Sequence, residues 1–229
     1  MTCIAVIPAR GGSKRIPQKN LALIGGASLV ERAIGAAQRC KSISRIIVTS
    51  DDQTILAKAR EMNVEFVVRP DKLAADDSPI EDAILHALDS AQAVSPLPKS
   101  LVLLQPTSPL RDSLRLESAI HEFVLQSRYG AMFGVVTAEH HPAKMLRRNG
   151  DTVVPFTNAA DLSASRQQLP DAFRQSGSIY VANVARFRAE RTLFLEPVGF
   201  IEVDAAEAID IDVPADLNYA IETSRRLSR

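Results

Sequence analysis

The chain opens with an apolar run that leads into a basic loop, residues 2–20, TCIAVIPARGGSKRIPQKN. Residues 2–8 form a short, continuous apolar stretch, which is typical of a strand buried on both faces. In the loop that follows, the adjacent glycines Gly11 and Gly12 leave backbone amides free to approach a ligand closely. This opening favours an α/β domain whose first loop binds a ligand.

Strand and helix patterns alternate through the first 136 residues. We expect helices at residues 28–40, 52–62, 79–93 and 114–126, and further strands at 45–49, 64–68, 101–104 and 131–136. Ser28 is a candidate N-cap, with Glu31 three positions on as its capping-box partner. The alternation predicts a mostly parallel, Rossmann-like α/β sheet with helices on both faces. Ligands bind at the carboxyl ends of the strands in such sheets, which directs attention to the loops after Pro8, Ser50 and Leu104.

The rhythm breaks at about residues 139–198, most clearly up to residue 185, where the sequence is polar and rich in turn residues. We expect an excursion from a single domain spanning residues 1–229, serving as a lid, a dimer contact or both. Short strands are predicted within it at 152–155 and 178–182. Beyond it we expect a strand at 199–203, an extended segment at 208–213 and a helix that begins at Pro214.

The bulk composition limits the classes of partner. With 27 basic and 27 acidic residues the net charge is zero, so nothing draws the protein to nucleic acid or to a membrane surface. An anionic substrate would therefore need a local basic pocket. No apolar run approaches the ~20 residues that span a bilayer, and no signal peptide is recognisable, so we expect a cytoplasmic protein. Cys3 and Cys40 are expected to be separate buried thiols.

The first loop carries the chemistry of a phosphate site. Four cations, Arg10, Lys14, Arg15 and Lys19, fall within ten residues with no acid among them, and Ser13 adds a hydroxyl. Backbone amides and cations together bind phosphate oxygens. The spacing matches neither the Walker loop nor the Rossmann glycine pattern. The alternative is a basic surface loop in which the glycines only turn the chain.

The same loop resembles the signature of the CMP-N-acetylneuraminic acid synthetase (acylneuraminate cytidylyltransferase) family, a group of nucleotidyltransferases. The resemblance implies that Arg10 and Lys19 contact a triphosphate and act in catalysis, and that Ser13 and Asn20 contact the nucleotide. It implies a nucleotide-binding role for the neighbouring loop residues as well, namely Ala9, Gly11 and Gly12. Arg69, followed by residues 73–78 with Asp76 and Ser78, resembles a further nucleotide-binding segment. Asp76 and Asp77 are equally well explained as caps of the following helix.

A second signature resembles residues 104–111, LQPTSPLR. Two prolines make the loop rigid and present Gln105, Thr107 and Ser108, whose amide and hydroxyls suit a neutral polyol. We therefore assign them to sugar binding. The alternative is a capped turn, with Asp112 or Ser113 as the N-cap of the next helix.

Two segments of the excursion also resemble the family. Residues 139–144 contain Lys144, a candidate cation for the sugar carboxylate, whereas the adjacent histidines before it are not expected to bind zinc. Residues 166–180 form the longest match, and their candidate sugar contacts are Arg166, Arg174 and Tyr180. Either arginine is alternatively a surface residue paired with Asp161 or Asp171. The resemblance implies a homodimer in which Phe194 reaches a partner's sugar pocket, although this chain has Leu193-Phe194 where paired phenylalanines are usual.

Residues 209–212, IDID, form an Asp-x-Asp pair in an extended segment. Alternation puts both carboxylates on one face and both isoleucines on the other. A lone pair of this kind is weak evidence, and Asp212 is also a candidate N-cap for the last helix. The resemblance implies that Asp210 and Asp212 hold catalytic Mg²⁺, with Mn²⁺ as an alternative.

These observations predict a cytidylyltransferase that joins a nine-carbon acidic sugar to CMP from CTP. The sugar is N-acetylneuraminic acid or a legionaminic or pseudaminic analogue. Two alternatives remain: a cytidylyltransferase for another acid sugar such as Kdo, and a non-catalytic nucleotide-binding module on the same fold.

Overall fold

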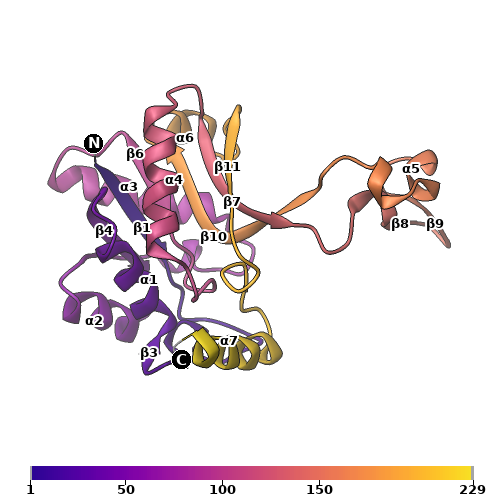
Figure 1. Cartoon of the computed structure of the whole chain (residues 1–229). Helices are drawn as coiled ribbons and strands as arrows, with labels where there is room; N and C mark the ends of the chain where they lie inside the picture. The colour runs from indigo at the N-terminus through magenta and orange to yellow at the C-terminus, as the bar shows by residue number, and fades with distance from the viewer. Residues whose placement is uncertain (1, 228–229) are drawn as a thin grey trace.

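The computed structural model describes residues 2–227 and has a seven-stranded central sheet (Figure 1). Its strand order is β11-β7-β10-β6-β1-β4-β5, and every strand is parallel to its neighbours except β10, which is antiparallel to both. The strands are β1 Cys3–Pro8, β4 Ile43–Ser50, β5 Glu65–Val68, β6 Ser100–Leu103, β7 Ala131–Thr137, β10 Phe173–Asn183 and β11 Val198–Glu202. The mostly parallel α/β sheet is therefore confirmed.

Helices cover both faces of this sheet, as the alternation in the sequence predicts. They are α1 Leu29–Gln38, α2 Gln53–Glu61, α3 Ile80–Val94, α4 Ser113–Leu125 and α6 Val184–Glu190. The last helix, α7 Pro214–Leu227, packs apart from the sheet faces. Alternate residues of β1 enter opposite cores: Ala5 packs in the cluster that contains residues of α1, α2 and α4, whereas Val6 packs with residues of α3 and α6. The apolar opening run is thus a strand buried on both faces.

The predicted helix starts have identifiable caps. Ser28 forms the expected capping box with Glu31 at the start of α1. Asp112, rather than Ser113, is the N-cap of α4, because its side chain accepts a hydrogen bond from the backbone amide of Leu114.

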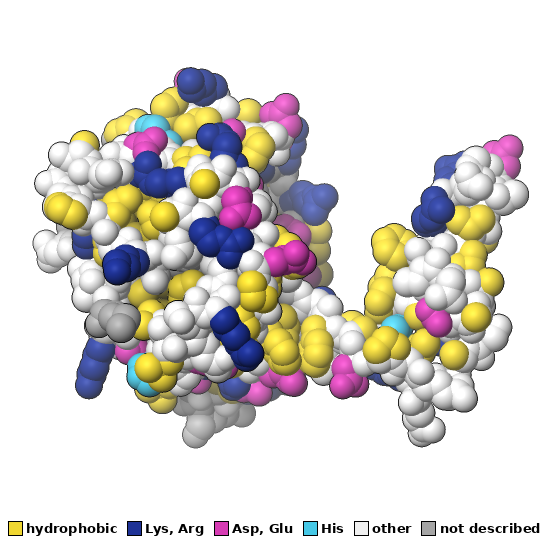
Figure 2. Space-filling model, turned by 90° about the horizontal axis from the view of Figure 1, so that it is seen from above, with side chains coloured by type: hydrophobic (Ala, Val, Ile, Leu, Met, Phe, Trp, Pro, Cys, Tyr) yellow, Lys and Arg dark blue, Asp and Glu magenta, His cyan; other side chains and the backbone are white. Residues whose placement is uncertain are grey.

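The excursion is shorter than predicted. An arm, residues 138–172, stands away from the body and carries β8 Leu146–Asn149, β9 Thr152–Pro155 and α5 Ala159–Ser163 (Figures 1 and 2). The amide of Ala138 donates to the carbonyl of Ala172 at 2.8 Å, which closes its base. Beyond it the chain returns to the main sheet as β10, so residues 173–198 belong to the body. The predicted domain of residues 1–229 also includes residues 1, 228 and 229, which lie outside the described residues.

A small third core anchors the last segment of the chain. Ile209 and Ile211 pack with Ile16, with Ala220 of α7 and with Ile24 of the hairpin formed by β2 Leu23–Ile24 and β3 Ala27–Ser28. This core holds the residues around the Asp-x-Asp pair against the start of the chain.

Two further observations concern the chain as described. Cys3 and Cys40 are buried free thiols, as expected. Between residues 2 and 227, no helix combines the length and the apolar character that a membrane span requires.

Candidate functional site

A cavity of about 220 Å³ opens beyond the carboxyl ends of β1, β5 and β6. It gathers residues from segments that are far apart in the sequence. The predicted site residues that line it are Arg10, Gly12, Ser13, Lys19, Asn20, Arg69, Asp76, Ser78, Gln105 and Thr107. The expectation that the loops at this edge of the sheet would form one site is therefore met for the loops after Pro8 and Leu104.

The loop that follows β4 holds the basic loop after β1 in place. The amide of Gly11 donates to Asp51 Oδ1 at 3.0 Å. A Cβ added at Gly11 would lie 2.7 Å from the Cβ of Asp52, so only glycine fits this approach. Ala9 and Gly11 do not line the cavity: Ala9 is buried in the core, and Gly11 faces Asp51 and Asp52. Asp51 and Asp52 were not predicted as site residues, although they begin the loop after Ser50, one of the three loops in which a ligand was expected.

Two cations of the loop meet one carboxylate at the cavity. Arg10 Nη1 lies 2.8 Å from Asp76 Oδ1, and Lys14 Nζ lies 2.5 Å from Asp76 Oδ2. Chiefly through its hydrogen bond with Lys14, this pairing lowers the pKa of the Asp76 carboxyl. Asp76 is not a cap of α3, whose N-cap is Pro79 without a side-chain hydrogen bond. It stands where an incoming anion would compete for the same two cations.

Buried polar groups set the position of the residues around these charges. Arg69 is only 6% exposed, and its Nη2 donates to the carbonyl oxygen of Thr49 at 2.7 Å. Burial lowers the pKa of its guanidinium, with nearby Arg10 contributing in the same direction. Asn20 donates through Nδ2 to the Arg10 carbonyl oxygen at 2.8 Å, which ties the two ends of the basic loop together.

A second cavity of about 350 Å³ shares Arg10, Ser13, Lys19 and Asp76 with the first and extends to Asp212. Lys19 Nζ donates to the Ile211 carbonyl oxygen at 2.8 Å and lies 3.4 Å from Asp212 Oδ1. The Asp-x-Asp pair therefore reaches the basic loop, although the two are at opposite ends of the chain.

The predicted alternation at the pair is confirmed: Asp210 and Asp212 are exposed, and Ile209 and Ile211 are buried. The segment is not a sheet strand, however, because the Ile211 amide donates to a loop carbonyl, that of Thr107, at 2.9 Å. Asp216 Oδ2 accepts hydrogen bonds from the amides of Asp212 and Val213, both at 2.9 Å. The start of α7 is thus stabilised by Asp216, which leaves the Asp212 carboxylate facing the cavity.

Asp210 and Asp212 offer carboxylate oxygens, which suit a hard divalent cation that takes its other ligands from phosphate and water. Within the described chain no group of three or more Asp, Glu, His or Cys side chains is arranged to hold a metal. Mg²⁺ commonly takes one or two protein carboxylates and completes its shell with phosphate oxygens and water. Asp212 lines the second cavity beside the cations of the basic loop, and Asp210, two residues before it, is likewise exposed, so the pair matches that habit.

Polar residues of β10 lie on the other side of this pair. Burial, and secondarily the charge of Asp210, raises the pKa of the Tyr180 phenol, so Tyr180 remains a neutral hydrogen-bonding group. Arg174 lies 3.4 Å from the Ala208 carbonyl oxygen through Nη2. Arg174 is exposed, as the surface alternative expects, but among the described residues no ion pair joins it to Asp161 or Asp171. Ser108, by contrast, is fully buried and does not line the cavity.

Six predicted sugar contacts line neither cavity: Ser108, Arg174 and Tyr180, described above, and Lys144, Arg166 and Phe194. Lys144 sits in the arm, and its ammonium donates to the carbonyl oxygens of Asp161, Leu162 and Ala164. Arg166 is also in the arm and donates to the Ala138 carbonyl oxygen at 3.3 Å. Phe194 is 56% exposed, with its ring centroid 6.1 Å from that of Phe133. These contacts depend on tertiary geometry that local sequence does not reveal.

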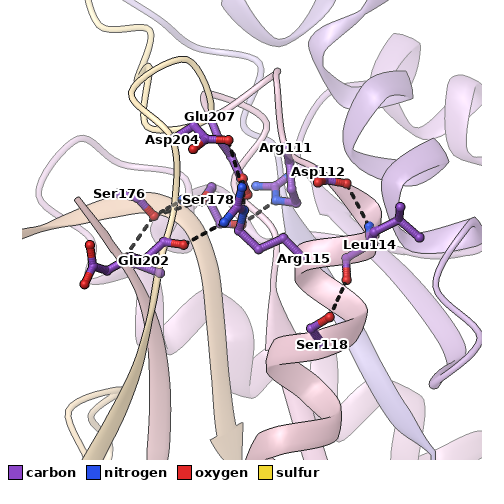
Figure 3. Close-up of polar contacts among 11 residues, drawn as sticks. Arg111, Asp112, Leu114, Arg115, Ser118, Ser176, Ser178, Glu202, Asp204 and Glu207 are labelled. Atoms are coloured by element: carbon purple, nitrogen blue, oxygen red, sulfur yellow. Dashed lines mark hydrogen bonds and ion pairs between the residues drawn. The ribbon is translucent and has the colours of Figure 1, made fainter.

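The sequence analysis assigned no role to a buried charge cluster behind Gln105. Arg111 donates through Nη2 to the Gln105 carbonyl oxygen at 3.0 Å. Through Nε it donates to the Ser178 carbonyl oxygen (Figure 3). Glu207 lies nearby, ion-paired with Arg115 at 3.0 Å. The arginine that ends the segment LQPTSPLR was the available signal.

With this geometry in view, comparison with known families is decisive, since the family model described as Cytidylyltransferase matches residues 4–224. The chain belongs to the cytidylyltransferase family. The resemblance inferred from the two signature loops is therefore confirmed.

Three relatives of this chain have names that describe enzymes acting on acid sugars. The chain is 28% identical to N-acylneuraminate cytidylyltransferase of Escherichia coli over 99% of its length. It is 28% identical to CMP-N,N'-diacetyllegionaminic acid synthase of Legionella pneumophila over 94% of the chain, and 25% identical to pseudaminic acid cytidylyltransferase of Campylobacter jejuni over 96%. The chain spans 53% of the first protein, 93% of the second and 95% of the third.

Solved structures support the fold. A CMP:2-keto-3-deoxy-manno-octonic acid synthetase, solved in complex with CTP, matches with a TM-score of 0.73 and 16% identity, covering 99% of this chain and 100% of that one. The 4-diphosphocytidyl-2C-methyl-D-erythritol synthase of Anaerococcus prevotii matches with a TM-score of 0.66 and 15% identity, covering 100% and 96%. Both show the same nucleotidyltransferase architecture.

Proposed function

We propose that this protein transfers the cytidylyl group of CTP to a nine-carbon acidic sugar, giving the CMP-sugar and pyrophosphate. The observation that carries the proposal is the pair of joined cavities in which Arg10 and Lys19 meet Gln105 on one side and Asp212 on the other. The relatives named for N-acylneuraminate, diacetyllegionaminic acid and pseudaminic acid support an acid sugar of this size.

The reaction joins the anomeric 2-hydroxyl of the sugar to the α-phosphorus of CTP. A bond forms between the sugar oxygen and phosphorus, the bond from phosphorus to the pyrophosphate oxygen breaks, and the hydroxyl proton leaves to water. Arg10 and Lys19 stabilise the charge that develops on the departing pyrophosphate. Ser13, Asn20 and the Gly12 backbone hold the nucleotide in line, because positioning and charge neutralisation dominate such transfers.

The acceptor is oriented from the opposite side. Gln105 and Thr107 bind sugar hydroxyls, while Arg174 attracts the carboxylate and Tyr180 donates a hydrogen bond. Asp210 and Asp212 would hold Mg²⁺, or Mn²⁺ in its place, which when bound neutralises phosphate charge and lowers the pKa of the attacking hydroxyl. When the triphosphate binds, Arg10 and Lys14 exchange their ion pairs with Asp76 for contacts with phosphate oxygens.

A homodimer is part of the proposal, because Lys144, Arg166 and Phe194 can serve a sugar site only across protomers. The support is apolar exposure on the arm and at its base (Figure 2). The exposed hydrophobic residues there are Met145, Leu146, Val153, Phe156, Leu162, Phe173 and Phe200. Apolar surface of this kind marks association sites. A cytoplasmic location, where CTP is available, completes the proposal.

The test is pyrophosphate release from CTP and Mg²⁺ with a panel of acid sugars: N-acetylneuraminic, legionaminic, pseudaminic and Kdo. We expect release with at least one nine-carbon sugar and little with Kdo. Release with Kdo alone would favour the shorter-sugar alternative. If protein that is folded by circular dichroism releases no pyrophosphate with any sugar, the proposed enzymatic activity is refuted.

A further inference from the structure

One guanidinium connects the Gln105 turn, which lines the cavity, to strand β10. Arg111 is 7% exposed and lies between the turn after β6 and strand β10 (Figure 3). It donates to the carbonyl oxygen of Gln105 at 3.0 Å and to that of Ser178. A planar guanidinium presents its donors in a rigid fork, so bonding two carbonyls fixes their relative position more tightly than the rotatable ammonium of a lysine does.

A buried acid, Glu207, stands close enough to this guanidinium to act on its charge. Burial lowers the pKa of Arg111 to about 10, with Glu207 opposing the shift, so the side chain is charged at neutral pH. Glu207 is 3% exposed and ion-paired with Arg115, which also pairs with Asp204 at 2.8 Å. The cluster therefore extends from the Gln105 turn to residues 204–207, directly before the segment that carries Asp210.

The two anchored carbonyls lie close to substrate-facing groups. Gly177, with φ of 77°, precedes Ser178, and a Cβ at Gly177 would lie 2.9 Å from Ser108 Oγ and 3.8 Å from Gln105 Oε1. A shift of the Ser178 carbonyl would thus move the Gly177 turn against the Gln105 side chain. Arg111 makes no hydrogen bond to the basic loop among the contacts described, so a change at Arg111 leaves the hydrogen bonds of that loop in place.

We propose that Arg111 is a positioning residue for the acceptor: by holding the carbonyls of Gln105 and Ser178, it sets the Gln105 amide and the Gly177 turn in the orientation that receives the sugar. It acts through these groups and does not line the substrate cavity. This inference rests on the proposed function.

The experiment compares Arg111→Lys with a matched control, Arg45→Lys. Arg45 likewise donates to two carbonyls, of Ser95 and Ala91, and pairs with Glu65 at 2.7 Å, but it lies near the start of β4, away from the carboxyl ends of the strands. For Arg111→Lys we expect KM for the sugar that the wild type uses to rise about tenfold or more, since both carbonyl contacts cannot be kept. The Kd of CTP, measured by titration calorimetry, should stay within about twofold. Arg45→Lys should change neither value.

An equal loss of CTP and sugar binding in Arg111→Lys, or kinetics like those of Arg45→Lys, would show a purely structural role and overturn the inference. If Arg111→Lys does not fold, Gly177→Ala displaces the same turn directly. It should raise the sugar KM with CTP binding unchanged, and an unchanged KM would also overturn the inference. A wild type inactive with every sugar refutes the proposed function itself, whereas an active wild type with an indifferent Arg111→Lys refutes only the inference.

Discussion

Lys19 and Asp212 form an ion pair in the second cavity, with Nζ 3.4 Å from Oδ1. The same ammonium donates to the Ile211 carbonyl oxygen at 2.8 Å. The basic loop that follows β1 and the carboxylates that precede α7 are thus joined by one side chain, and the phosphate and metal ends of the proposed site lie together.

Asp212→Asn should leave folding intact, because the side chain is 61% exposed, but slow turnover at least about a hundredfold. The reason is that the variant loses a carboxylate where the triphosphate charge must be neutralised, a loss of about 3 kcal/mol in transition-state stabilisation. Arg10→Ala should behave similarly. Steady-state kinetics and thermal unfolding measure both effects.

The matched control is Asp89→Asn, which breaks a surface ion pair with Arg188 of 2.9 Å outside the cavities. It should turn over like wild type. Wild-type rates in Asp212→Asn would remove Asp212 from the mechanism.

Gly11→Ala should lower the free energy of unfolding by about 1–3 kcal/mol, because the new Cβ has no room beside Asp52. Gly12→Ala is the control: a Cβ there meets nothing within 4 Å, so its stability should change by less than about 0.5 kcal/mol. Urea unfolding of the two variants compares them directly. Equal stability would mean that the Asp51–Asp52 support of the loop is unimportant.

Features that depend on neighbouring residues could be predicted from the sequence, and features that depend on distant contacts could not. The strands and helices up to residue 136 were predictable, because apolar period and caps such as Ser28 are local signals. The strand β10 was only partly predicted, because Arg174, Gln175, Ser176 and Gly177 read as a polar turn and its antiparallel place in the sheet depends on distant partners. The joining of Lys19 to Asp212 likewise depends on the tertiary packing of Ile209 and Ile211, which alternate with the aspartates.

Glu207→Gln should alter the pH dependence of stability. Burial raises the pKa of the Glu207 carboxyl above 4.5 in the folded protein, so the folded state binds more protons than the unfolded state as pH rises from 4.5 to the folded-state pKa. Wild-type stability therefore contains a contribution that declines over that window, and the amide variant lacks it. The difference in unfolding free energy, variant minus wild type, should rise with pH there. Parallel curves, obtained from urea unfolding at several pH values, would contradict this assignment.

Phe156→Asp should dissociate the proposed homodimer, because the side chain is 59% exposed on the apolar arm and a charge there resists burial. Sedimentation velocity should give a dimer for wild type and a monomer for the variant, with sugar turnover reduced. Leu114→Asp, 78% exposed on α4 of the body, is the control and should remain dimeric. A monomeric, fully active wild type would exclude contributions of the arm across protomers.

The central claim is cytidylyl transfer to an acid sugar, and ³¹P NMR of a complete reaction tests it most directly. With CTP, Mg²⁺ and the preferred nine-carbon sugar, we predict a new phosphodiester resonance from the CMP-sugar that grows in equal amount with pyrophosphate. Pyrophosphate accompanied by CMP alone, or no consumption of CTP with any acid sugar, would contradict it.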